Sequence, residues 1–184
     1  MKTRAILVGL ALTIACAGIV PAAVAMSGDA PATVAKAADG AEAAPRLSGR
    51  AYFDAVQCPS PPADYEDFTS YPGLVMTGSL EGCWYTKVIT SKETPSGVYL
   101  ESGEEVFVGS LDGAPVGTFA TTYAFESKWD PDVSSGVELR GRCQHPIVKG
   151  SGTGAFEGAT GRLDFKDIIG DPVTYVYRGH ISFR

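Results

Sequence analysis

Five glycines interrupt the segment from Lys149 to Asp167, and single aromatic or aliphatic residues lie between them. The glycines are Gly150, Gly152, Gly154, Gly158 and Gly161, and the apolar residues are Phe156, Leu163 and Phe165. Glycine reaches positive φ without a Cβ clash, so such a segment turns and bulges sharply. We expect a short strand at residues 155–157, a tight turn at 158–161 and a returning strand at 162–168. Curvature of this kind is typical of a corner in a small β-barrel.

Short β-like runs separated by turn residues fill the chain from residue 47 onward. Residues 118–129 alternate best, and residues 173–183 alternate in the same way. We expect further strands at residues 50–56, 74–80, 83–90, 98–101, 104–111 and 137–148, with Ser102-Gly103 as one of the turns. No amphipathic helix is indicated after Leu47. The sequence therefore predicts an all-β fold of about eight antiparallel strands, a closed barrel first and a sandwich second.

The run Gly-Thr-Gly-Ala-Phe-Glu-Gly-Ala-Thr-Gly-Arg from Gly152 to Arg162 resembles the glycine-rich hairpin of the allene oxide cyclase-like and dirigent-like β-barrels. Secreted bacterial members look most similar, and the resemblance extends loosely over residues 74–184. It implies an eight-stranded, calycin-like barrel with a cavity, which in the plant members often assembles as a homo-oligomer. The catalytic positions of the plant enzymes find no residue-by-residue match here, so the resemblance bears on the fold and leaves catalysis open.

A shorter motif, Gly82-Cys83-Trp84, is similar to the Gly-x-Trp signature of lipocalins and avidins. In those barrels the Trp closes one end against an Arg of the last strand, and Arg178 or Arg184 is the candidate partner here. We prefer the simpler interpretation that Trp84 fills the core.

The first 25 residues have the organisation of a secretory signal peptide, with Lys2 and Arg4 before an apolar run and small residues ending at Ala25. The apolar run is shorter than the ~20 residues that a membrane-spanning helix needs. Lipoprotein anchoring at Cys16 is a weaker alternative, because Thr13 stands where an aliphatic residue is expected. We therefore expect a secreted protein.

Residues 26–46 are rich in Ala and lack aromatic residues, which indicates a flexible linker before a barrel domain at residues 47–184. Loss of the two cations in the signal peptide takes the formal charge from −6 to −8. Such a charge repels phosphate backbones and anionic surfaces, so nucleic acid is excluded as a partner and no membrane span is expected in the mature chain.

Three cysteines remain after cleavage: Cys58, Cys83 and Cys143. An odd number outside the cell indicates one disulfide and one free thiol. We expect Cys83 to pair with Cys143, since both lie in strand-like runs near a glycine. Cys58 is the rival partner for either one.

Cys58 opens a long loop at residues 58–73 that is rich in proline, acidic and aromatic residues. Its aromatic residues are Tyr65, Phe68 and Tyr71. We expect them to attach the loop to the core. The alternative is that the loop is functional, as loops of this length often are.

The alternating faces supply the candidate lumen residues. They are Phe119, Tyr123, Phe125, Trp129, Tyr175 and Tyr177. Glu126 is a further candidate if it faces inward opposite an Arg, although an outer-face ion pair is the preferred interpretation. His145 and His180 are the two histidines, too few for a metal site of three or four ligands. No nucleotide loop or serine-nucleophile elbow is present, so we expect no cofactor.

These observations favour a non-catalytic barrel that binds a small apolar or aromatic molecule in its lumen or mouth. One alternative is a cofactor-free isomerase, cyclase or dirigent-like guide that steers a reactive intermediate by positioning it. A further alternative is a filled barrel that acts through its outer surface.

Overall fold

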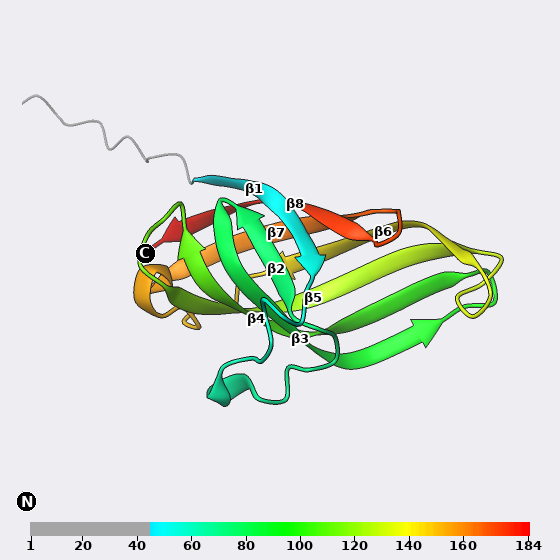
Figure 1. Cartoon of the computed structure of the whole chain (residues 1–184), viewed down its shortest axis with the longest axis horizontal. Coiled ribbons are helices and arrows are strands. Elements are labelled where there is room, and N and C mark those ends of the chain that lie inside the picture. The colour runs from blue at the N-terminus through cyan, green and yellow to red at the C-terminus, as the bar shows by residue number, and fades with distance from the viewer. Residues whose placement is uncertain (1–44) are drawn as a thin grey trace, which may run out of the picture. The chain divides into compact units, whose positions relative to one another are not determined.

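A computed structural model describes residues 45–184 of the chain (Figure 1). The predicted signal peptide and nearly all of the predicted linker lie outside the described residues. The first strand begins at Arg46, one residue before the expected start of the barrel domain.

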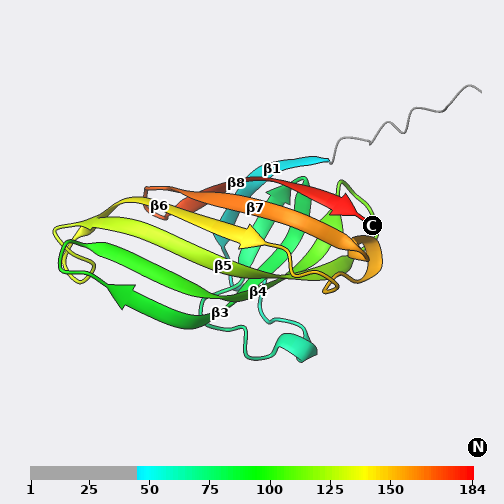
Figure 2. The same cartoon turned by 180° about the vertical axis from the view of Figure 1, so that it is seen from behind.

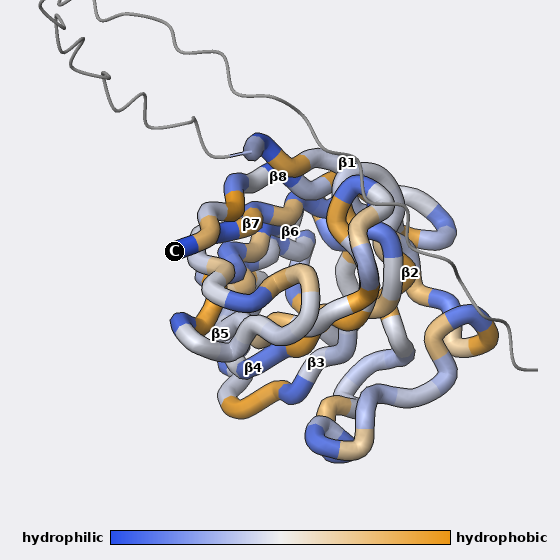
Figure 3. The backbone as a smooth tube through the Cα atoms, turned by 90° about the vertical axis from the view of Figure 1, so that its left-hand side faces the viewer, coloured by the Kyte–Doolittle hydropathy of each residue, from blue (hydrophilic) through white to orange (hydrophobic). Residues whose placement is uncertain are grey.

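Eight antiparallel strands follow one another around a closed barrel, and the last pairs with the first (Figures 1 and 2). They are β1 (Arg46–Phe53), β2 (Leu74–Gly78), β3 (Leu80–Glu93), β4 (Val98–Leu111), β5 (Gly117–Asp130), β6 (Val137–Pro146), β7 (Ala159–Ile168) and β8 (Thr174–Phe183). Two short 3-10 helices, η1 (Ala63–Tyr65) and η2 (Gly154–Phe156), lie in loops. Seen along the barrel in Figure 3, the strands form a ring. The predicted all-β fold of eight antiparallel strands is confirmed.

Three local predictions are wrong. Residues 155–157 are not a strand and residues 158–161 are not a turn, because Gly154 to Phe156 form η2 and the next strand begins at Ala159. Gly158 has a φ of +74°, the left-handed conformation that suits glycine, and it turns the chain from η2 into β7. Ser102-Gly103 is not a turn either, since β4 runs unbroken from Val98 to Leu111.

One end of the barrel is filled by large side chains. Phe156 of η2 is fully buried and inserts between strands, with its ring centre 5.6 Å from that of Phe107 and 5.0 Å from that of Phe119. Trp84 packs on the same two phenylalanines. Tyr177 accepts a hydrogen bond from the Leu80 N–H and donates one to the Thr77 carbonyl, which fastens β8 to the β2–β3 turn. This end of the barrel is therefore a solid aromatic core.

Trp84 is thus a core residue, as preferred from the sequence. The lipocalin-like pairing with an arginine does not form, because Arg178 and Arg184 are both exposed.

The loop between β1 and β2, seen below the strands in Figure 1, covers part of the outer wall. Phe68 is buried there in a small cluster with Val75, Tyr85 and Val106, and Tyr65 packs on its ring at 5.1 Å. These two aromatic residues attach the loop to the outside of the barrel, in a second core separate from the interior. Tyr71 behaves differently and reaches the barrel interior.

The disulfide joins Cys58 to Cys83, so the predicted Cys83–Cys143 bond is wrong. Cys83 points outward from β3 toward the loop cluster that contains Cys58. Cys143 points inward from β6, where it is buried as a free thiol. Successive side chains of a strand alternate between faces, and the two sulfurs of the predicted pair lie on opposite sides of the barrel wall.

Candidate functional site

A cavity of about 300 Å³ occupies the end of the barrel opposite η2. The carboxyl ends of β1, β5 and β7, the amino ends of β2, β4 and β8, and inward residues of β3 and β6 line it, together with Tyr71 and Val133 from loops. Its size falls at the lower end of the range for small-molecule pockets. The barrel is therefore filled at one end and hollow at the other.

Four of the six aromatic residues predicted for the lumen line this cavity: Tyr123, Phe125, Trp129 and Tyr175. Phe119 and Tyr177 instead belong to the filled end. Five further aromatic residues line the cavity, and the sequence analysis did not assign them to it: Phe53, Tyr71, Trp84, Tyr99 and Phe165. The walls are therefore mainly aromatic.

Glu126 lies outside the barrel. Its Oε1 is 3.6 Å from Nη1 of Arg140 and 3.5 Å from Nη2 of Arg142. The preferred interpretation, an ion pair on the outer face, agrees with this geometry. The candidate role of Glu126 in the lumen is wrong, because even-numbered residues of β5 point away from the interior.

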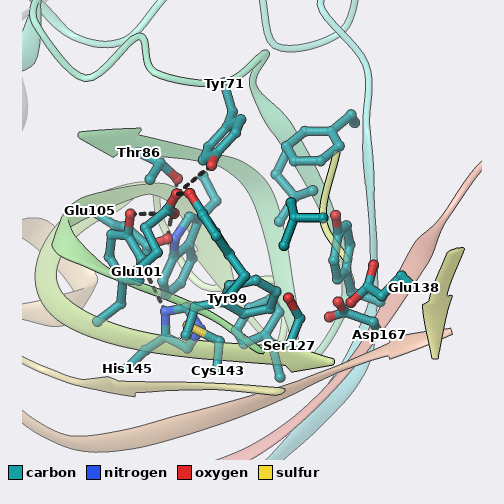
Figure 4. Close-up of a pocket in the computed structure, with 18 of the residues that line it drawn as sticks. Tyr71, Thr86, Tyr99, Glu101, Glu105, Ser127, Glu138, Cys143, His145 and Asp167 are labelled. Carbon is teal, nitrogen blue, oxygen red and sulfur yellow. Dashed lines mark hydrogen bonds and ion pairs between the residues drawn. The ribbon is translucent and has the colours of Figure 1, made fainter. Parts of the chain in front are cut away.

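The interior carboxylate of Glu101 accepts three phenol hydrogen bonds (Figure 4). The hydroxyls of Tyr71 and Tyr99 both donate to Oε2 at 2.6 Å, and that of Tyr123 donates to Oε1 at 2.7 Å. Glu101 is only 6% exposed. The carboxylate raises the pKa of Tyr71 and Tyr123 further, after burial of each phenol, so these hydroxyls remain donors.

Glu105 lies four residues beyond Glu101 on the same inner face of β4 and is 5% exposed. Its Oε2 is 2.5 Å from Nδ1 of His145 and also accepts a hydrogen bond from Thr121, while Oε1 accepts one from Thr86. Nε2 of His145 is buried and has no hydrogen-bond partner among residues 45–184. The carboxylate therefore fixes the imidazole ring with its second nitrogen shielded from solvent.

A second pair of carboxyls, Glu138 and Asp167, lies on the other side of the cavity from Glu101 and Glu105 (Figure 4). A β-bulge puts Glu138 there. Lys128 pairs with Arg140 but the next residue, Trp129, pairs with Glu138, so Leu139 has no partner on β5. The extra residue reverses the alternation, and Glu138 turns into the cavity while Leu139 is 55% exposed.

The two carboxyls occupy the space that a side chain at position 141 would fill, because this residue is Gly141. A Cβ atom at this position would lie 2.0 Å from Oδ2 of Asp167 and 2.6 Å from Oε1 of Glu138. Any larger residue would displace them.

Burial and the proximity of the two acids change their protonation. Burial, a hydrogen bond with Asp167 and the charge of Asp167 raise the pKa of Glu138 from 4.5 to about 8. Burial also raises the pKa of Asp167. Glu138 is therefore mostly protonated at neutral pH.

Cys143 also faces the cavity. It lies on β6 between Glu138 and His145. Burial, and then the charges of Glu105, Asp167 and Glu101, raise the pKa of its thiol. Since the thiolate is the nucleophilic form, this thiol is unreactive at neutral pH.

The polar groups of the cavity were not predicted as lumen residues from the sequence: Glu101, Glu105, Glu138, His145 and Asp167. A signal existed in β4, where Tyr99, Glu101, Gly103, Glu105 and Phe107 alternate on one face. Treating Ser102-Gly103 as a turn concealed that alternation. No sequence signal marks the bulge that turns Glu138 inward.

No Lys or Arg side chain of the described part of the chain lines the cavity. Within residues 45–184, no three His, Cys, Asp or Glu side chains converge as metal ligands would. No helix in this part of the chain has the length and hydropathy needed to cross a bilayer. The chain matches no protein-family profile, no curated protein and no solved structure.

Proposed function

We propose that this protein binds a small organic molecule with an apolar or aromatic body in the hollow end of its barrel. The observation that supports this most is the aromatic cavity of about 300 Å³, closed at its base by the packed core around Trp84. Rings and aliphatic groups of a ligand would replace water against these walls, which is the main favourable contribution to binding in such pockets.

The state of the polar groups in the cavity agrees better with ligand binding than with catalysis. Both oxygens of Glu101 are engaged by phenols, and the free nitrogen of His145 is shielded. A general base needs a lone pair within reach of the substrate. The thiol of Cys143 is protonated. None of these three groups is set up to start a reaction.

One observation favours a second candidate function, a cofactor-free isomerase. Glu138 carries a proton at neutral pH and faces the cavity, as a general acid would. Native mass spectrometry of protein isolated from its source would separate the two functions. A retained molecule recovered unchanged after incubation with fresh protein supports binding, and conversion to an isomer of equal mass supports catalysis.

The protein's location and relatives are also part of the proposal. A disulfide, and the absence of a membrane-spanning helix in the described residues, are consistent with an extracellular location. We propose that residues 1–25 direct export and that the barrel is related to the allene oxide cyclase-like group. Homo-oligomerisation, which that relationship implies, stays a prediction.

A fluorescence titration with the neutral apolar probe N-phenyl-1-naphthylamine tests binding. We expect enhanced emission on binding to the full chain. We also expect its loss in Ser127→Phe, because Ser127 is buried in the cavity wall. Ala124→Phe is the matched control, since Ala124 is exposed on the outer face of the same strand. Equal emission from both variants, or none from the unmodified protein, would contradict the proposal.

A further inference from the structure

The cavity contains more acidic groups than basic partners. Among residues 45–184, four carboxyls line it, from Glu101, Glu105, Glu138 and Asp167, and no lysine or arginine does. Among the described residues, His145 is the one basic side chain that pairs with any of these carboxyls, and it pairs with Glu105. Buried acids in proteins are normally paired or neutralised. Glu101 is satisfied by its three phenols, which leaves Glu138 and Asp167 without a donor of positive charge.

Glu138 and Asp167 contact each other, and one carboxyl oxygen of the pair still has no hydrogen-bond partner in residues 45–184. Asp167 is 6% exposed, so water solvates it poorly. Oε1 of Glu138 is buried with no hydrogen-bond partner in the described part of the chain. The bulge at Leu139 and the missing side chain at Gly141 both bring these oxygens together. The bulge and the missing side chain therefore bring two acids together and leave Oε1 of Glu138 free to accept a hydrogen bond from a ligand.

Aromatic rings stand on both sides of this pair. Trp129 on β5 is the cross-strand neighbour of Glu138, and Tyr175 on β8 is that of Asp167. The indole N–H of Trp129 donates to Ser127 at 2.9 Å, and Phe53 packs edge-on against Tyr175 at 5.6 Å, so both rings are held in place. Carboxylates between aromatic faces are the surroundings that a cationic nitrogen prefers.

We propose that the molecule bound in this cavity is an organic cation, an aromatic or apolar amine or quaternary ammonium, whose charged nitrogen lies against Glu138 and Asp167. This inference rests on the proposed binding function and specifies its ligand class. The body of the ligand extends toward Tyr123 and Phe125. Glu101 is not the anchor, because phenol hydroxyls already occupy both of its oxygens.

Proton release accompanies binding. A cation beside the pair favours the ionised form of Glu138, which otherwise holds a proton at neutral pH. The other titratable groups that line the cavity are Tyr71, Tyr99, Glu101, Glu105, Tyr123, Cys143, His145 and Tyr175. Burial raises the pKa of the four phenols and of the thiol, so these five groups stay neutral and do not compensate.

Isothermal titration calorimetry of the full chain with 2-phenylethylammonium, 2-phenylethanol and phenylacetate tests the inference at pH 7.5. The three probes share a ring and differ in charge. We expect the ammonium to bind at least about tenfold more tightly than the alcohol, and the carboxylate more weakly than both. Benzyltrimethylammonium carries a fixed charge and cannot titrate. Its binding should make the protein release up to about one proton, which appears as a difference in binding heat between phosphate and Tris buffers.

The double variant Glu138→Gln/Asp167→Asn should bind the ammonium no better than the alcohol. Glu126→Gln is the matched control, because it removes an acid from the outer face and should change nothing in the cavity. Binding of N-phenyl-1-naphthylamine verifies that each variant keeps its cavity. A competition experiment with the unmodified protein needs no variant. Benzyltrimethylammonium should displace N-phenyl-1-naphthylamine from the cavity.

Two results would overturn the inference. If the neutral probe binds but the ammonium binds no better than the alcohol, the ligand class is wrong and the binding function stands. If neither the neutral probe nor any of the charged ones binds, the binding function fails and the inference fails with it.

Discussion

Replacing Glu138 by glutamine should stabilise the protein in alkaline solution and leave it unchanged in mild acid. A carboxyl whose pKa is raised by folding keeps a proton that the unfolded chain releases. Stability therefore falls as pH rises from about 4.5, the unfolded value, to about 8, the folded one. Glutamine has the shape of the protonated carboxyl and cannot ionise, so the variant lacks this loss.

The magnitude follows from the size of the shift. A change from 4.5 to about 8 corresponds to an upper limit of about 5 kcal/mol. Glu138 is only half-buried at the mouth of the cavity, so solvent screens its interaction with Asp167. We expect a gain of about 1–2 kcal/mol at pH 8.5 and none at pH 5.

Urea unfolding at pH 5, 6.5 and 8.5 measures this difference between the variant and the unmodified protein, in which all other titrating groups largely cancel. Glu126→Gln serves as the control. It removes two exposed ion pairs, so it should lower stability by less than about 1 kcal/mol at pH 8.5, the opposite sign. An equal loss of stability with pH in Glu138→Gln and in the unmodified protein would contradict the raised pKa of Glu138.

Three further outcomes are expected. Replacing Cys58 and Cys83 by serine should lower the free energy of unfolding by about 3.5 kcal/mol, from the closure of a loop with a sequence separation of 25, and a loss below about 1 kcal/mol in urea would contradict this. Tyr71→Phe removes one of three donors to the buried Glu101 carboxylate and should cost about 1–2 kcal/mol in the same assay, whereas an unchanged midpoint would show that this hydrogen bond contributes nothing. The thiol of Cys143 should react with Ellman's reagent only after unfolding, and rapid reaction of the folded protein would mean that it is accessible.

The alternation of apolar residues carried enough information to predict the barrel. In β5 and β8 the aromatic residues repeat every second position, and the structure turns that face inward. Prediction failed where an inward face is polar. Glu101 and Glu105 alternate with Gly103 between aromatic residues, and such a pattern resembles a solvent-exposed edge until the three phenols around Glu101 are known.

Two other features depend on packing that a single sequence does not reveal. The bulge at Leu139 changes which residues of β6 face inward, and it is fixed by the register of β6 on β5. The pairing of Cys58 with Cys83 depends on the loop folding back onto the outer wall, where Phe68 is buried. Both are decided by contacts between segments far apart in the chain.

Because Phe156 seals one end of the barrel, the hollow is a blind chamber with no through passage in the described structure. A ligand bound as proposed would therefore leave through the same mouth by which it entered. A substitution that only narrows this mouth would lower the association rate and the dissociation rate of the ligand by the same factor. Residence time and occupancy can therefore be tuned separately, the first at the rim and the second at the walls within.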